Sequence, residues 1–126
     1  MTADFTDLIG APFRWGGRDP RTGIDCWGVC LEGLRRLGIP FRADWVYSEA
    51  DARSLVRAVR EGTSRLARIP EQQAETGDIV IMDSRHAGLV TDEGILHSCA
   101  GFGCCMQSAE RLRILYRTLE WYRWQG

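Results

Sequence analysis

Hydrophobic positions in the first half of the chain recur at helical spacing. Phe5, Leu8 and Ile9 form a short helical stripe, which the stretch from Gly10 to Pro12 ends. A glycine-rich loop is predicted over residues 13–24, and Asp25 can cap a helix that begins at Cys26. The buried face of this helix is predicted to consist of Trp27, Cys30, Leu31, Leu34 and Leu37, with its end at Gly38 and Pro40.

A second amphipathic helix is expected over residues 49–61, with Ser48 as its N-cap. Its apolar stripe consists of Ala52, Leu55, Val56 and Val59, and Gly62 ends it. Residues 63–76 are polar and are expected to form a connector. The first half of the chain is therefore predicted to be mainly helical.

After Gly77 the pattern changes to short β-rich runs separated by turn residues. The predicted strands are 78–83, 86–91, 95–99, 104–107 and a last one near 118–124. Helices first and strands afterwards indicate an α+β domain, in which an antiparallel meander packs against the helix that starts at Cys26.

The length of 126 residues suits one domain, 1–126, and the apolar fraction of 44% is ordinary for a globular protein. A net charge of −1 argues against a nucleic-acid partner. No run approaches the roughly 20 apolar residues that span a bilayer, so we expect no membrane insertion. The first residues hold two acids and no base, so no Sec-type signal is predicted and we expect synthesis in the cytoplasm.

Five cysteines are an odd number, and two of them, Cys104 and Cys105, are adjacent, which makes a poor disulfide framework. A reducing compartment fits better, and one thiol is free for chemistry. Cys26 is the strongest candidate, because N–H groups and the dipole at a helix start favour a thiolate and can lower its pKa. The same groups could hold an oxyanion. The alternative is that Cys26 is an inert, buried hydrophobe.

The two histidines, His86 and His97, both lie on the predicted hairpin 86–99. With a two-residue turn at Asp92–Glu93, His86 faces Cys99 and the two histidines share one face of the hairpin. A three-residue turn would place them on opposite faces. With the first register, His86 can take a proton from Cys26 while His97 orients His86. Each histidine could otherwise be purely structural.

A zinc site is a competing interpretation. Its ligands would come from Cys26-x3-Cys30, His97-x-Cys99 and Cys104-Cys105. Cys30 fits the core stripe of its helix, however, and the chain contains no CxxC pair. We therefore expect neither a metal nor a cofactor.

Two groups of motifs resemble the NlpC/P60 family of cysteine peptidases. Residues 8–17 (LIGAPFRWGG) and 23–29 (GIDCWGV) are similar to the family pattern G-x-P-Y-x-W-G-G followed by D-C-x-G. Residues 77–82, 86–90 and 95–98 resemble its later blocks G-D-L-V, H-V-G-I-Y and I-H-A. The blocks occur in order over about residues 8–98; each is weak alone, and together they are specific.

The resemblance implies a papain-like α+β fold and a catalytic triad of Cys26, His86 and His97. It also implies hydrolysis of amide bonds in peptidoglycan stem peptides, of the γ-D-glutamate–diamino acid type. The Asp-Cys-Trp-Gly motif is most similar to the phage-tail and prophage branch of the family. We therefore expect the protein to act at the cell wall or in the virion, with phage tail proteins as further partners.

One residue departs from the family pattern, because Phe13 stands where the family has a tyrosine near its substrate. We place Phe13, Trp15, Asp25 and Trp27 along the expected substrate cleft, although Asp25 is mainly a helix cap and both tryptophans could be core residues. The departure leaves two rival functions open. One is a catalytically inactive binding or tail-assembly module with this fold, and the other is a cysteine amidase toxin with another acyl substrate.

Overall fold

The computed structural model describes residues 3–41, 52–62 and 64–126, with only the backbone of residues 52–55. The N-terminal half holds the 3-10 turn η1 (Thr6–Leu8), the short strands β1 (Arg18–Asp19) and β2 (Gly23–Ile24), and helices α1 (Cys26–Arg36) and α2 (Ala52–Glu61). None of the helices in these ranges is long and apolar enough to cross a membrane.

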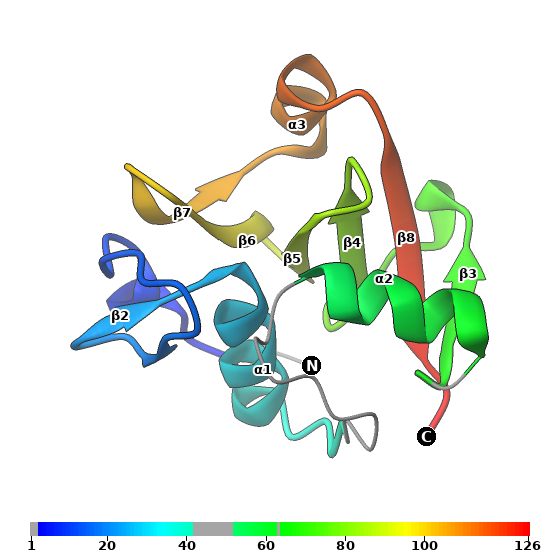
Figure 1. Ribbon diagram of the computed structural model, residues 1–126, viewed down its shortest axis with the longest axis horizontal. Coiled ribbons are helices and arrows are strands. Elements are labelled where there is room, and N and C mark those ends of the chain that lie inside the picture. The colour runs from blue at the N-terminus through cyan, green and yellow to red at the C-terminus, as the bar shows by residue number, and fades with distance from the viewer. Residues whose placement is uncertain (1–2, 42–51, 63) are drawn as a thin grey trace.

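The C-terminal half is mainly a sheet (Figure 1). Its elements are β3 (Leu66–Ile69), η2 (Glu71–Gln73), β4 (Ile79–Met82), β5 (His86–Thr91), β6 (Gly94–Cys99), β7 (Gly103–Gln107), α3 (Ala109–Leu115) and β8 (Leu119–Trp124). The six strands are antiparallel in the order β3-β8-β4-β5-β6-β7, so the C-terminal strand lies between β3 and β4. The α+β architecture and the meander β4 to β7 are as expected.

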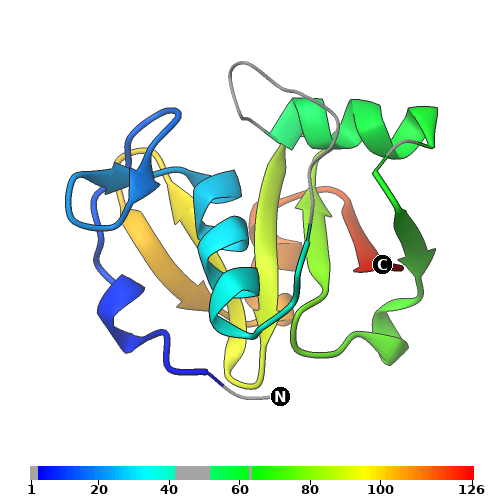
Figure 2. The ribbon, with the colours of Figure 1, turned by 90° about the horizontal axis from the view of Figure 1, so that it is seen from below.

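The two faces of the sheet support separate apolar clusters. On one face α1 packs against β5 and β6 (Figure 2), and alternate strand residues belong to the same apolar cluster: Ile79, Ile81, Ala87, Leu89 and Leu96. On the other face Leu112 of α3 packs among Val80, Met82, Val90, Ile95 and Trp121. This alternation is the period of two that a sheet covered on both sides requires.

The expected helix at Cys26 is confirmed, and so is the hairpin register on which the histidine placement depends. The pairs Leu89↔Leu96, Val90↔Ile95 and Thr91↔Gly94 leave Asp92 and Glu93 as a two-residue turn. On α1, Trp27, Cys30, Leu34 and Leu37 are buried as predicted, and Leu31 is half-buried.

Three predictions of secondary structure were wrong. The loop 13–24 contains the hairpin β1–β2, the connector 63–76 contains β3 and η2, and α3 follows β7 where no helix was expected. Two of the missed elements have few buried side chains, since Leu112 alone is buried on α3 and no residue of β3 is fully buried, while β1 and β2 have only two residues each. The predicted N-cap Ser48 and the start of the second helix at 49 lie outside the described residues.

Candidate active site

The start of α1 is held by the carboxylate of Asp25. One oxygen accepts from the backbone N–H of Gly28 at 2.7 Å and from the Arg18 guanidinium at 2.8 Å. The other oxygen accepts from the backbone N–H of Gly16 at 2.9 Å. Asp25 is only 1% exposed, so these bonds form largely away from water, where they are strong. The carboxylate therefore fastens the glycine-rich loop to the helix at the residue before Cys26.

Two glycines allow this loop and the helix to touch. A Cβ on Gly28 would lie 2.5 Å from the backbone oxygen of Gly17, and a Cβ on Gly17 would lie 2.1 Å from the backbone oxygen of Gly23. Neither space could hold a side chain without moving main chain. The close approach gives a physical reason for glycine at both positions of the Trp-Gly-Gly and Asp-Cys-x-Gly motifs.

Cys26 is the first residue of α1 and is 4% exposed. Burial raises the pKa of its thiol to about 11, and the nearby backbone N–H groups of Ala87 and Trp27 offset this only in part. The expected lowering of this pKa at the helix start is therefore wrong for the protein without substrate. Ala87 directly follows His86, so β5 brings the thiol and the imidazole into one neighbourhood.

The two histidines and Gln107 form a chain of hydrogen bonds. Nε2 of His86 lies 2.9 Å from Nδ1 of His97, and Nε2 of His97 lies 2.6 Å from Oε1 of Gln107. His97 is fully buried, and the ring of His86 stacks on Tyr116 with centroids 5.6 Å apart. Neighbouring strands supply these groups, because β6 and β7 pair His97 with Cys105 and Ile95 with Gln107.

This chain assigns the tautomers of both rings. An amide oxygen can only accept, so Nε2 of His97 carries a proton and its Nδ1 has a lone pair. Nε2 of His86 then donates to that lone pair, which leaves Nδ1 of His86 unprotonated. Among the described residues no side chain hydrogen-bonds to this Nδ1. It is the nitrogen that can accept a proton from a nucleophile.

Both imidazoles are neutral at ordinary pH. Burial, together with the charges of His97 and Arg85, lowers the pKa of His86 to about 4. Burial also lowers the pKa of His97, against the opposing hydrogen bond to Gln107. The raised pKa of Cys26 and the lowered pKa of His86 both favour a thiol and a neutral base at rest over a thiolate–imidazolium pair.

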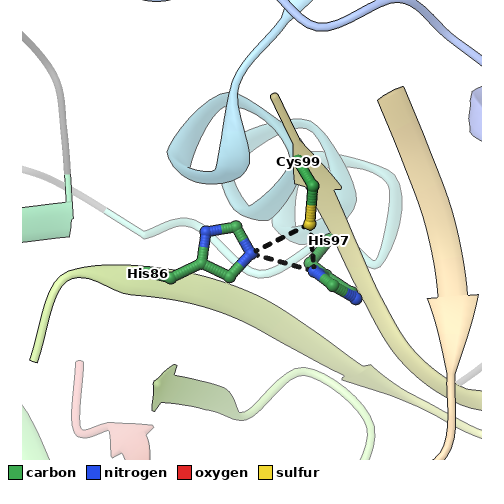
Figure 3. Close-up of side chains that lie close together, drawn as sticks. All are labelled: His86, His97 and Cys99. Carbon is green, nitrogen blue, oxygen red and sulfur yellow. Dashed lines mark hydrogen bonds between the residues drawn. The ribbon is translucent and has the colours of Figure 1, made fainter. Parts of the chain in front are cut away.

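Cys99 lies against the histidine pair (Figure 3). Its sulfur is 3.2 Å from Nδ1 of His97 and 3.7 Å from Nε2 of His86, and the hydroxyl of Tyr116 is 4.0 Å away. From the sequence, Cys99 was expected opposite His86 and was a ligand only in the competing zinc interpretation, while Gln107 and Tyr116 were not identified. Gln107 was within reach of that reasoning, since it lies two residues beyond the partner of His97 and so on the same face.

The four residues expected along the substrate cleft divide into two pairs. Trp15 is 72% exposed and stacks edge-on against the half-buried Phe13, with ring centroids 4.9 Å apart, so both can meet a ligand. Trp27 is fully buried and packs on Phe41, and Asp25 is also buried. Both residues help to position the helix that carries Cys26, and the expectation that they also contact substrate stays a prediction.

Comparisons with known proteins agree with the motifs. The model of the NlpC/P60 family matches residues 10–104. The chain is 31% identical over 90 residues to murein DD-endopeptidase MepH of Escherichia coli (strain K12), covering 69% of this chain and 28% of that protein. It is 30% identical over 87 residues to the bifunctional muramidase/DL-endopeptidase CwlT of Bacillus subtilis (strain 168), covering 68% of this chain and 22% of the other. The chain thus spans about a quarter of each relative.

Proposed function

Because this chain belongs to the NlpC/P60 family, we propose that it is a cysteine peptidase that hydrolyses amide bonds in peptidoglycan stem peptides. Cys26 is the nucleophile, His86 is the base and His97 orients His86. The observation that carries the proposal is the hydrogen-bond chain from Gln107 through His97 to His86. It leaves Nδ1 of His86 as a free acceptor on β5, the strand whose Ala87 N–H contacts Cys26.

The proposed reaction has two halves. Nδ1 of His86 takes the Cys26 proton as the sulfur attacks the amide carbonyl, and the backbone N–H at the start of α1 stabilises the oxyanion. The protonated His86 then gives the proton to the leaving amine. Water, activated by the same nitrogen, hydrolyses the thioester and restores the thiol. Throughout, His97 stabilises the charged His86 ring, as the third member of a triad does.

The substrate class is supported by the two relatives, both of which are named as endopeptidases, one of them of murein. Their names differ in the bond type, DD for one and DL for the other. The family motifs favour cleavage between γ-D-glutamate and the diamino acid. A site of the DL kind would release a dipeptide end, whereas a DD site would separate cross-linked peptides.

The proposal is tested by incubating purified peptidoglycan with the protein under reductant and identifying the released fragments by mass spectrometry. Wild type and Cys104→Ser should release fragments, and Cys26→Ser should release none. Cys104 serves as the matched control because its thiol is also buried but lies on β7 rather than at the helix start. Equal release by wild type and Cys26→Ser would contradict the proposal.

A catalytically inactive binding module is the second candidate. It is favoured by Phe13 in place of the family tyrosine. Under this alternative, wild type and Cys26→Ser would sediment equally with peptidoglycan while neither cleaves it. Phe13→Tyr restores the hydroxyl. If this variant cleaves peptidoglycan, wild type lacks only a substrate contact; if it does not, the catalytic centre itself is inactive.

The cellular setting is a further part of the proposal. The Asp-Cys-Trp-Gly motif at residues 25–28 supports a role at the cell wall as part of a phage tail. Detection of the protein in purified particles, by mass spectrometry of virions after a stringent wash, would support this role. Its presence only in the soluble fraction of the host would refute it.

A further inference from the structure

Cys99 is a nucleophilic side chain that the proposed mechanism leaves without a role. Its sulfur, Nε2 of His86 and Nδ1 of His97 all lie within 4.8 Å of one another and converge on a common point (Figure 3). We propose that these three atoms form a binding site for Zn²⁺ whose occupation withdraws the imidazole base from the proposed catalytic centre. The inhibition rests on the proposed function, whereas the binding does not.

The separations of the three atoms are close to those in a zinc site. Tetrahedral ligands at the usual zinc distances lie about 3.4 Å apart for two imidazole nitrogens and about 3.6 Å apart for a nitrogen and a sulfur. The corresponding separations here are 2.9 Å, 3.2 Å and 3.7 Å. Side-chain shifts of about 0.5 Å or less would therefore open the hydrogen-bonded cluster into a coordination shell.

The surroundings of His97 already suit a metal ligand. A ligating histidine normally donates its other ring N–H to an oxygen, which fixes the tautomer and the ring plane. The 2.6 Å bond from Nε2 of His97 to Gln107 provides this, and it leaves Nδ1 with its lone pair toward Cys99. His97 is fully buried, so its position is set by packing before an ion arrives.

The remaining two ligands are accessible. His86 and Cys99 are each half-buried, which gives an ion a route from solvent and leaves a fourth position for water. On binding, the Cys99 thiol releases its proton to solvent, and His86 adopts the tautomer with its proton on Nδ1. That tautomer cannot accept the proton of Cys26, so a bound ion blocks the proposed first step.

The thiolate is expected to dominate the affinity. The charge of Arg85 acts on His86, where it helps to lower the pKa, and it would also repel a dication. Two neutral imidazoles alone would have to bind against that repulsion, whereas a Cys99 thiolate offsets it. Loss of this thiol should therefore weaken zinc binding strongly even though both histidines remain.

Binding is tested with Co²⁺ and Zn²⁺ on the Cys26→Ser protein, which removes the nucleophile as a competing thiol. We expect one Co²⁺ per chain with a sulfur-to-cobalt charge-transfer band, displaced by Zn²⁺. Cys99→Ser in this background should lose the band and weaken Zn²⁺ binding by more than the roughly 10–100-fold typical of losing an outer partner. Cys105→Ser is the matched control and should keep both, although its sulfur lies 3.6 Å from Nε2 of His97.

Three results would overturn the site. They are absence of the band in Cys26→Ser, an unchanged band after Cys99→Ser, or loss of binding in Cys105→Ser. Gln107→Leu provides a variant that keeps all three ligands and should bind Zn²⁺ about 10–100-fold more weakly. Circular dichroism of each variant excludes unfolding as the cause.

The inhibition is tested separately on the active protein. Fragment release by wild type should stop on addition of about one Zn²⁺ per chain and return on chelation. Normalised to its own metal-free rate, Cys99→Ser should need at least ten times more free Zn²⁺ for half inhibition. If cobalt binds as expected but peptidoglycan is never cleaved, the metal site is supported and the proposed function fails. If zinc binds to an active protein without inhibiting it, the proposed inhibition is refuted.

Discussion

Replacement of Gly28 by alanine tests whether the contact between the glycine-rich loop and α1 is as tight as the structure shows. A Cβ at this position would lie 2.5 Å from the backbone oxygen of Gly17 and 2.8 Å from a side-chain carbon of Ile24. The first neighbour is main chain, which can move away only if the loop itself moves. We expect the loop to be displaced from the start of the helix.

The magnitude follows from two opposing effects. An alanine in a helix is favoured over glycine by at most about 1 kcal/mol, and less in the first turn. Overpacking against a rigid neighbour typically costs about 1–3 kcal/mol, and displacement of the loop also strains the bonds that Asp25 makes to Gly16 and Gly28. The Gly28→Ala protein should therefore be less stable by about 2 kcal/mol.

The assay is urea denaturation followed by tryptophan fluorescence. Gly33→Ala is the control, since it lies in the same helix but its Cβ would meet the end of the Leu89 side chain rather than main chain. It should lose clearly less stability than Gly28→Ala. Equal stability of Gly28→Ala and wild type, or a larger loss for Gly33→Ala, would refute the argument that main-chain contact dictates glycine here.

Three further predictions concern the site. Asp25→Ala should lower the free energy of unfolding by roughly 3 kcal/mol or more, because it removes a buried carboxylate that accepts from two backbone N–H groups and pairs with the Arg18 guanidinium; a loss below about 1 kcal/mol in urea titrations would contradict this. The pKa of His86 is about 4 in the folded protein, below the 6.5 of the unfolded chain. The contribution of neutral His86 to the free energy of unfolding is therefore present above pH 6.5 and is lost as the pH falls toward 4. Wild type should lose up to about 3 kcal/mol over that window relative to His86→Gln, and parallel stability curves would argue against it. Gln107→Leu should reduce kcat at least ~10-fold with little change in KM, whereas Gln107→Glu, which keeps the acceptor, should retain most of the rate.

The parts of the fold that could be predicted from sequence are those with strong local signals. Asp25 followed by an apolar stripe predicts α1, and the two-residue turn at Asp92–Glu93 predicts the hairpin and the shared face of His86 and His97. β3 escaped prediction because its pairing partner, β8, lies more than fifty residues away, and pattern analysis detects short-range order best. α3 escaped because one buried residue, Leu112, makes no periodicity.

The pairing of the two histidines was predictable from the sequence, whereas Gln107, Tyr116 and the electrostatics of the site were not. The hairpin register places His86 and His97 on one face of neighbouring strands. The burial of Cys26, in contrast, depends on how α1 packs against β5. That tertiary contact raises the pKa of the thiol, so a rule based on the helix start alone gave the wrong direction. Trp15 and Trp27 make the same point, because one residue type is exposed in a loop and buried in a helix stripe.

The position of β8 has a consequence for the order in which the chain can fold. Ile79 pairs with Tyr122 and Leu66 with Trp124, so β3 and β4 are joined only through the last strand of the sequence. Contacts over such separations close large loops and slow the search for the native state. During synthesis the hairpin β5–β6 can form early, whereas β3 cannot pair until β8 has left the ribosome. We expect the domain to mature only after β8 has left the ribosome, and nascent chains that stop before β8 to remain sensitive to protease around β3.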